Sequence, residues 1–454
     1  RAWIGALLLA GVVIGAGVKS AEKETEPPPK IEIGPDGMPV YRHPYKDGLY
    51  STVTAMNMFY VEEVKNQQKL KLKVPGFHKD VPVYRVLQDY QAPLVVVLVG
   101  VDGKVNGPWG DLFPYWFSEA GCHTLTFDSP FTPQYPEISG QGVVGNFDAE
   151  ADQIAAIIAA YLAQPEVKSK VTKVGVLGMS MSGLYALQLA VKAKAGTLPF
   201  ELSGCLALSA PLRLKSAARV VDRFFREDRW NTTLVELAQR FGPHVPVAEG
   251  EPIPFAATEM RAAIGFVFRD GLTKVVERND RYYRLGLLPS EESGENRDTW
   301  AEATGFERFI ETFSFAYWNK AGKVKTAEEL WDSADVVKLL PKLPAYAQIV
   351  IAANDPFISA DDIAAAQAAD TQHALTVLPV GGHLGFAAAD WTLIKALRIF
   401  GQRRQQSLEP DDDRTPDEAR KETLKEVREN LDQPIPPADD NKIPEPRSRE
   451  GLKK

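Results

Sequence analysis

The feature that most restricts what this chain can fold into is a regular alternation of apolar runs and helical stretches. Residues 93–100 (PLVVVLVG) form a continuous β-branched run, as expected of a strand that is covered on both faces. Further strands are expected at residues 122–128, 171–177 and 204–210, separated by helices at 108–120, 148–163 and 181–195. Strands that alternate with helices predict a parallel sheet with right-handed crossovers.

The alternation stops at Pro211, and the next expected strands are residues 348–353 and 374–380, with helices at 360–369 and 384–400. Before the first run, residues 70–74 and 81–87 have the pattern of an antiparallel hairpin. We therefore expect an α/β fold, a mostly parallel sheet with helices on both faces. Its core comprises residues 31–211 and 346–404, and residues 212–345 form a helical cap insertion.

The amino end has a different character. Residues 3–18 (WIGALLLAGVVIGAGV) are apolar and uncharged. At about 1.5 Å per residue, a helix of this length nearly spans a hydrocarbon core of about 30 Å. We expect residues 1–18 to be a membrane segment, either a retained anchor or a cleaved signal peptide; a buried soluble helix is the third reading. Residues 19–30, which include a Pro-Pro-Pro run, are predicted to be a linker.

The charges around this segment do not decide on which side of the membrane the following domain lies. Lys19, Lys23 and Lys30 follow it and Arg1 precedes it, which by itself would place the following domain in the cytoplasm. A lone amino-terminal apolar segment commonly leads its domain outward. We therefore expect a membrane-associated protein whose large domain is extracytoplasmic.

Composition argues against several partners and cofactors. The formal net charge is −8 and no basic stripe occurs, so nucleic acid is not an expected partner. Metal-ligand spacings, phosphate-binding loops and dinucleotide fingerprints are missing, so we expect no metal and no organic cofactor. Cys122 and Cys205 each begin a strand-like run and are expected to be buried thiols. Residues 405–454 are charged and rich in proline, which predicts a solvated tail that is a candidate for binding a protein partner.

The segment that carries chemistry is residues 173–183 (KVGVLGMSMSG), in which Ser180 lies between an expected strand and an expected helix. Such a corner forces the serine into a tight turn and lifts its hydroxyl above the sheet. Gly178 permits close approach of the neighbouring chain. The usual G-x-S-x-G pattern has glycine where this chain has Ser182, and the added Cβ is expected to open the turn slightly. The alternative is an ordinary helix-capping serine.

A serine hydroxyl needs a base, and the base needs a group that fixes its tautomer. Asp355 directly follows the strand expected at 348–353, and His383 follows the one expected at 374–380. Both therefore lie at carboxyl ends of strands, where open α/β sheets build their sites. The order Ser180, Asp355, His383 is the order of the catalytic triad in α/β-hydrolases. We expect these three residues to be nucleophile, orienting acid and general base.

An oxyanion formed at this serine needs two backbone N–H donors. One is expected from Met181, at the start of the helix after Ser180. The other is expected from Val101, in the loop after the strand at 93–100. A plain glycine turn is the alternative for that loop.

Two segments of the cap have open interpretations. Phe224 and neighbouring aromatic residues share a helical stretch with Arg219, Arg223, Arg226 and Arg229. This pattern is typical of a half-buried cap helix with a solvated basic face; the alternative is a lid surface that meets acidic lipid headgroups. Residues 264–267 (IGFV) pack in the cap core or line an apolar pocket.

The stretches NDPF at Asp355 and GGHLGF at His383 resemble the YheT-like branch of the α/β-hydrolase superfamily. Residues 98–103 (LVGVDG) are similar to the H-G-x-x-G loop of that branch, with Val99 in place of its histidine, and residues 304–318 and 340–357 resemble its passage from cap to sheet. The resemblance covers roughly residues 60–400. It implies an α/β-hydrolase fold and an ester-type hydrolase without metal or organic cofactor. Some membrane-anchored members act on lipids.

Two functions follow. The first is a serine hydrolase, a carboxylesterase or lipase that forms an acyl-enzyme on small-molecule or lipid esters with apolar acyl groups. The second is a catalytically inactive, membrane-tethered scaffold of the same fold that binds a partner. The order of Ser180, Asp355 and His383 favours the enzyme, because a binding protein needs none of the three. Amide, thioester or acyl-transfer chemistry at the same site stays open.

Overall fold

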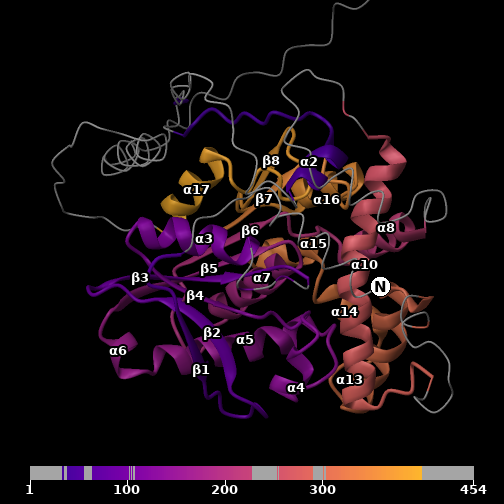
Figure 1. The fold of residues 1–454 in the computed structure, drawn as a ribbon, viewed down its shortest axis with the longest axis horizontal. Helices are drawn as coiled ribbons and strands as arrows, with labels where there is room; N and C mark the ends of the chain where they lie inside the picture. Colours follow the sequence, from indigo (N-terminus) through magenta and orange to yellow (C-terminus); the bar gives the residue numbers. More distant parts are fainter. Residues whose placement is uncertain are drawn as a thin grey trace, which may run out of the picture.

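An eight-stranded sheet in the order β1-β2-β4-β3-β5-β6-β7-β8 runs through the molecule (Figure 1). The computed structural model describes residues 33–34, 38–55, 64–101, 103, 105, 108–226, 253, 255–289, 300 and 303–400. The strands are β1 (Gln68–Leu72), β2 (Val81–Val86), β3 (Ala92–Leu98), β4 (His123–Phe127), β5 (Val171–Met179), β6 (Gly204–Leu208), β7 (Ala347–Ala352) and β8 (Leu375–Leu378).

Strand direction follows from the connections. A loop of residues 73–80 joins β1 to β2, which pair antiparallel, and β2 also runs antiparallel to β4. All other neighbouring strands are parallel, because helical connections carry the chain back to the same edge of the sheet. The expected hairpin and the mostly parallel sheet are therefore both present.

Helices cover both faces of the sheet, as expected. Every residue of β3 is buried, and its alternate side chains enter two separate cores: Leu94 and Val96 one, Val95 and Val97 the other. The helices over the first core are α5 (Phe147–Leu162) and α7 (Met181–Lys194), and those over the second are α3 (Pro108–Glu119) and α17 (Asp390–Phe400). Shorter helices connect the strands, namely α4 (Tyr135–Ser139), α6 (Pro165–Lys168) and α16 (Ala360–Ala369).

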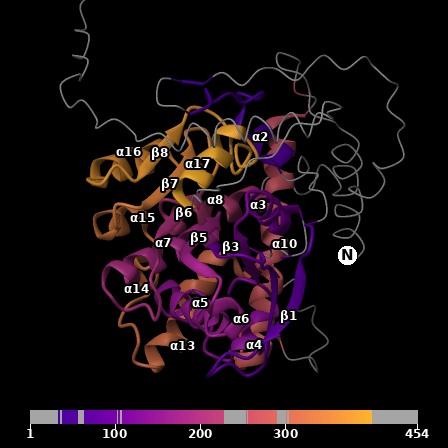
Figure 2. The same cartoon turned by 90° about the vertical axis from the view of Figure 1, so that its left-hand side faces the viewer.

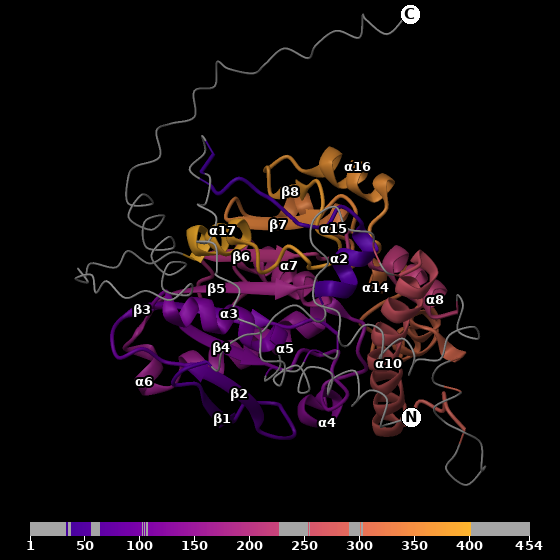
Figure 3. The same cartoon turned by 45° about the horizontal axis from the view of Figure 1, so that its top comes forward.

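The described residues between β6 and β7 form a series of helices joined by non-helical segments. Figures 1 and 3 show α8 (Leu214–Arg226), α10 (Ala257–Tyr283) and α14 (Ala327–Asp332) together at one side of the sheet. Gly265 of α10 permits a close approach to α8, because a side chain there would come within 2.4 Å of the Phe225 nitrogen. The helices of this cap are α8 (Leu214–Arg226), α10 (Ala257–Tyr283), α12 (Phe306–Arg308), the π-helix η3 (Phe309–Ser314), α13 (Phe315–Lys320), α14 (Ala327–Asp332), α15 (Val336–Leu339) and the 3₁₀ helix η4 (Leu340–Lys342).

One loop of the core, residues 142–146, fastens the cap. Its backbone groups are hydrogen-bonded to side chains of cap residues. The N–H groups of Gly142 and Val144 donate to the Tyr283 hydroxyl and the Asn279 side-chain oxygen. The carbonyls of Val143 and Val144 accept from the Trp318 indole and the Ser314 hydroxyl. The loop is also bound to Glu150 of α5. The Glu150 carboxylate accepts hydrogen bonds from the N–H groups of Gly145 and Asn146 and from the Tyr185 hydroxyl. Burial raises the pKa of Glu150 to about 7.

The structure corrects one expected helix and adds another. The helix expected at 384–400 begins only at Asp390, because Gly381, Gly382 and Leu384 have positive φ angles of 137°, 55° and 66° that a helix does not allow. The added helix is α2 (Gly48–Ala55), which packs against α10 (Figure 2).

Three of the expected segments cannot be compared with the structure. The predicted membrane segment 1–18, the linker 19–30 and the tail 405–454 lie outside the described residues. Within the described residues, no helix has both the length and the apolar character to cross a membrane.

Candidate active site

Ser180 occupies the sharp turn between β5 and α7. β5 ends at Met179 and α7 begins at Met181, so the expected strand–helix corner is present. Ser180 has φ 52° and ψ −127°, a strained conformation for a residue with a side chain. The turn is fixed by the Ser180 N–H, which donates to the Leu208 carbonyl at 2.8 Å, and by the Gly183 N–H, which donates to the Ser180 carbonyl at 2.9 Å.

Two glycines allow this turn to close. A Cβ at Gly178 would lie 2.2 Å from the Ser182 carbonyl oxygen, and one at Gly183 would lie 2.8 Å from the Ala210 Cβ. The close contacts of the turn thus fall on Gly178 and Gly183. The side chain of Ser182 points to the end of β3, where its hydroxyl donates to the Val99 carbonyl at 2.5 Å.

His383 and Asp355 meet Ser180 at the carboxyl edge of the sheet. His383 Nε2 lies 2.8 Å from Ser180 Oγ, and His383 Nδ1 lies 2.8 Å from Asp355 Oδ2. A carboxylate can only accept, so Nδ1 carries the proton and Nε2 accepts from the serine hydroxyl. The remaining Asp355 oxygen accepts from the Phe357 N–H at 2.9 Å. The three predicted residues are thus joined in one chain of hydrogen bonds.

The loop that carries His383 is held from outside by groups that sequence reasoning missed. Thr52 of α2 accepts the His383 N–H at 2.9 Å, and Ser209 accepts the Leu384 N–H at 3.0 Å. Asn354 accepts the Gly382 N–H at 2.9 Å. Gly48 of α2 packs so closely that a side chain there would lie 1.9 Å from the Asn354 carbonyl oxygen. These bonds fix the backbone from which the imidazole projects.

The loop after β3 lies beside the serine. A side chain at Gly100 would come 3.1 Å from Ser180 Cβ and 3.6 Å from Ser180 Oγ, so this glycine leaves space directly above the nucleophile. Val101 follows in a turn, and Met181 begins α7 on the other side of Ser180. Both residues predicted as oxyanion donors therefore belong to segments that border Ser180.

Aromatic side chains line the other side of the imidazole. The Phe357 ring packs edge-on against His383 with centroids 4.7 Å apart, and Phe268 of α10 does the same at 5.8 Å. Phe268 follows residues 264–267, which differ in their exposure. Ile264 is fully buried in the core, whereas Val267 is 42% exposed. The exposed fractions of Ser180, Asp355 and His383 are 8%, 2% and 5%, so the site is enclosed.

Other reactive groups lie away from this site. Cys122 and Cys205 are buried thiols that are not joined in a disulfide, as expected, and burial raises the pKa of the Cys205 thiol to about 12. In the described part of the chain, no group of three or more His, Cys, Asp or Glu side chains is arranged to hold a metal ion.

A mostly parallel sheet with helices on both faces, and a strained serine between a central strand and its helix, defines the α/β-hydrolase class. A family model described as the alpha/beta hydrolase family matches residues 95–393, and the chain belongs to this family. Among curated proteins, none matches this sequence.

Several solved structures resemble the chain. A carboxyl esterase 2 from the mycorrhizal fungus Tuber melanosporum is 14% identical, with 88% of this chain and 99% of that chain covered and a TM-score of 0.40. An esterase from Pyrococcus furiosus is 12% identical, with 84% and 99% covered and a TM-score of 0.41. A putative lipase from Acinetobacter baumannii is 13% identical, with 77% and 96% covered and a TM-score of 0.40.

Proposed function

We propose that the protein is a serine hydrolase that cleaves carboxylic esters of apolar acids. The observation that carries this proposal is the continuous relay from Ser180 Oγ to His383 Nε2 and from His383 Nδ1 to Asp355, with both contacts at 2.8 Å. A buried relay of this kind activates a hydroxyl that is otherwise a poor nucleophile.

The proposed reaction has two halves. Ser180 Oγ attacks the ester carbonyl carbon while His383 Nε2 takes the hydroxyl proton, and Asp355 stabilises the resulting imidazolium. The negative charge on the carbonyl oxygen is stabilised by the backbone N–H groups of Met181 and Val101. Collapse releases the alcohol, which takes the proton from His383, and leaves an acyl-enzyme. Water then attacks the acyl-enzyme by the same steps, which frees the acid and restores Ser180.

Two further features support apolar substrates and the finer family assignment. Phe357 and Phe268 present ring edges to His383, so the groups bordering the relay on that side are apolar. The NDPF and GGHLGF stretches, whose Asp355 and His383 form the relay, support membership of the YheT-like branch. We also propose that residues 3–18 hold the enzyme at a membrane, with the catalytic domain on the extracytoplasmic side.

Labelling with a fluorophosphonate tests the proposal, because the reagent reacts with activated serines. We expect wild-type protein to be labelled at Ser180. Ser180→Ala should lose both labelling and hydrolysis of a simple ester, the latter by about 10³-fold or more. Unchanged thermal melting of the variant provides the folding control. A wild-type protein that is folded but neither labelled nor active would favour the inactive scaffold.

A further inference from the structure

Ser209 is a strained and fully buried residue at the end of β6. Its φ angle is 47°, in the left-handed region that a residue with a side chain adopts only at a cost in conformational energy. Strain of this kind persists where the surrounding structure imposes it, and it gathers at functional sites. The φ angle also sets the direction of the Cα–Cβ bond relative to the preceding peptide, so the strained backbone decides where the Ser209 hydroxyl lies.

Backbone hydrogen bonds join the end of β6 to the strands on either side. The Leu208 carbonyl accepts the Ser180 N–H at 2.8 Å, so β6 holds the turn of the nucleophile. The Ser209 N–H donates to the Val350 carbonyl of β7 at 2.8 Å, and β7 leads directly to the loop of Asp355. Two consecutive residues at one strand end therefore connect the nucleophile with the strand of the orienting acid.

The Ser209 hydroxyl adds a third connection, to the loop of the base. It accepts the Leu384 N–H at 3.0 Å, and this contact is buried. Leu384 directly follows His383 and has a φ angle of 66°, so the bond joins two strained residues. Thr52 accepts the N–H of His383 itself. The two amide groups that flank the Cα atom of His383 are thus both held by side-chain hydroxyls, one from α2 and one from the sheet.

The bond from Ser209 connects the base to the nucleophile by a short route. From Ser180 this route runs through the Leu208 carbonyl and the Ser209 side chain to the Leu384 N–H. A displacement along the route changes the distance between Ser180 Oγ and His383 Nε2, which is 2.8 Å. A misplacement of reacting groups by about 1 Å can lower a rate about 100-fold, so even a smaller shift of the base would be visible in kcat.

We propose that Ser209 is a positioning residue of the hydrolase, whose hydroxyl sets the place of the His383 imidazole relative to Ser180. Ser209 acts through the backbone of the base loop and not on the substrate itself. This inference rests on the proposed ester hydrolysis, and it gives the strained backbone at the end of β6 a role in that reaction.

Two substitutions separate the hydroxyl from the strained backbone. Ser209→Ala removes the hydroxyl and keeps a side chain at the strained φ, whereas Ser209→Gly removes the hydroxyl and also relieves the strain. We expect both variants to lower kcat about tenfold and to keep KM within about twofold, because a misplaced base slows proton transfer and leaves substrate binding intact. Ser209→Gly should nevertheless melt at a higher temperature than Ser209→Ala.

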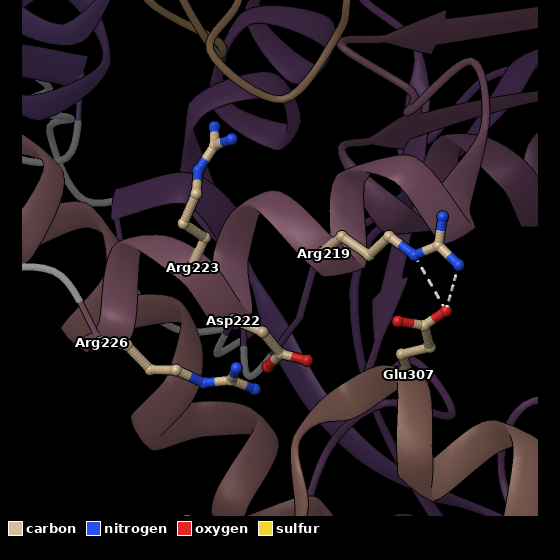
Figure 4. A pocket seen from close by; sticks show the side chains of 5 residues that line it. All are labelled: Arg219, Asp222, Arg223, Arg226 and Glu307. Atoms are coloured by element: carbon tan, nitrogen blue, oxygen red, sulfur yellow. Dashed lines mark hydrogen bonds and ion pairs between the residues drawn. The ribbon is translucent and has the colours of Figure 1, made fainter.

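The measurement is steady-state hydrolysis of a soluble ester, with the concentration of active sites determined by titration with a fluorophosphonate. Ser203→Ala is the matched control, because Ser203 directly precedes β6 and its hydroxyl donates to the Val174 carbonyl at 3.0 Å, at the opposite end of the same strand. Arg219→Gln is the control for the cap. It breaks the exposed pairing of Arg219 with Glu307 in the charged pocket between α8 and α12 (Figure 4). Both controls should retain wild-type kcat and KM.

Wild-type kcat in either Ser209 variant, or an equal loss of kcat in the controls, would overturn the proposal. Recovery of kcat in Ser209→Gly alone would overturn it as well, because relief of strain rather than loss of the hydroxyl would then govern the rate. If Ser209→Ala does not fold, Ser209→Gly gives the answer, and failure of both to fold would refute a positioning role. Failure of the proposed function differs from all these results, because the wild-type protein would then be neither labelled nor active.

Discussion

The hydroxyl of Ser182 donates a 2.5 Å hydrogen bond to the carbonyl oxygen of Val99, which connects the first turn of α7 to the end of β3. Ser182 is 1% exposed, so water cannot replace this bond. The bonded carbonyl lies two residues before Val101, the proposed oxyanion donor. Ser182, which stands in place of the usual glycine, thus joins the turn at Ser180 to the loop of the proposed oxyanion donor Val101.

We expect Ser182→Ala to lower kcat about tenfold with little change in KM, because a loosened oxyanion loop weakens only interactions made in the transition state. Ser182→Thr retains a hydroxyl and should recover part of the rate. Steady-state kinetics on a soluble ester measure both parameters. Wild-type kcat in Ser182→Ala would show that the bond has no role in positioning the loop.

Thr52 gives a second test of positioning. Thr52→Val removes the acceptor of the buried His383 N–H with little change in shape, at a cost of about 1–3 kcal/mol in stability. We expect a fall in kcat of about tenfold, with recovery in Thr52→Ser. The control is Thr54→Val in the same helix, since the Thr54 hydroxyl donates to the Tyr50 carbonyl of α2 itself. Equal losses in both valine variants would attribute the effect to α2 as a whole.

Stability should decline as pH rises because of Glu150. Burial raises the pKa of Glu150 to about 7 in the folded protein, above its value in the unfolded chain. The folded state therefore binds the proton more tightly, and this contribution is complete below about pH 4.5 and lost as pH rises through about 7, for a total of about 3 kcal/mol. Glu150→Gln imitates the protonated carboxyl and should flatten this dependence in denaturant unfolding at pH 5 to 8. A variant with the same pH slope as wild type would exclude Glu150 as its source.

Acyl-chain length should govern the rate. Each CH₂ buried against the apolar cap contributes about 0.8 kcal/mol, so kcat/KM should rise from acetyl to about hexanoyl or octanoyl esters and then level off. Phe268→Ala removes one aromatic ring beside His383. We expect it to lower kcat/KM for octanoyl esters more than kcat/KM for acetyl esters, so that the increase with chain length becomes smaller. Equal rates for acetyl and octanoyl esters, or a preference for peptide amides, would contradict an apolar acyl site.

Location is tested by fractionation. If residues 3–18 are a retained anchor, the protein should sediment with membranes and resist extraction by high salt, because burial of apolar surface is not screened by ions. A chain without residues 1–30 should be found in the soluble fraction with full esterase activity. Protease added to intact cells or spheroplasts should digest an extracytoplasmic domain, and protection until lysis would reverse the assigned orientation.

The parts of the fold that sequence predicted are those with a short-range signal. The β-branched run of β3 and the alternation that follows predict a parallel sheet, and Ser180, Asp355 and His383 could be predicted to lie at the same edge because each follows a strand. The start of α17 could not be placed. Its apolar pattern extends back to Leu384, but the glycines at 381 and 382 and the contacts of the His383 loop hold residues 381–389 in turns.

The supporting groups of the site escaped prediction for a different reason. Thr52 and Ser182 act through hydrogen bonds to residues far away in sequence, and their immediate neighbours carry no sign of those partners. The departure from glycine at Ser182 was visible, but the hydrogen bond from its hydroxyl to the Val99 carbonyl could not be predicted from it. Only the folded chain shows that the close contacts of the turn fall on the glycines at 178 and 183.

The bond between Thr52 and His383 joins residues 331 positions apart. Pairings across so long a loop carry a closure entropy that other contacts must offset first, so they form late in folding. During synthesis, α2 leaves the ribosome long before the strand that precedes His383, so the His383 N–H that Thr52 accepts is added only near the end of the fold. A nascent chain that stalls before β8 can therefore contain a finished nucleophile turn and still lack esterase activity.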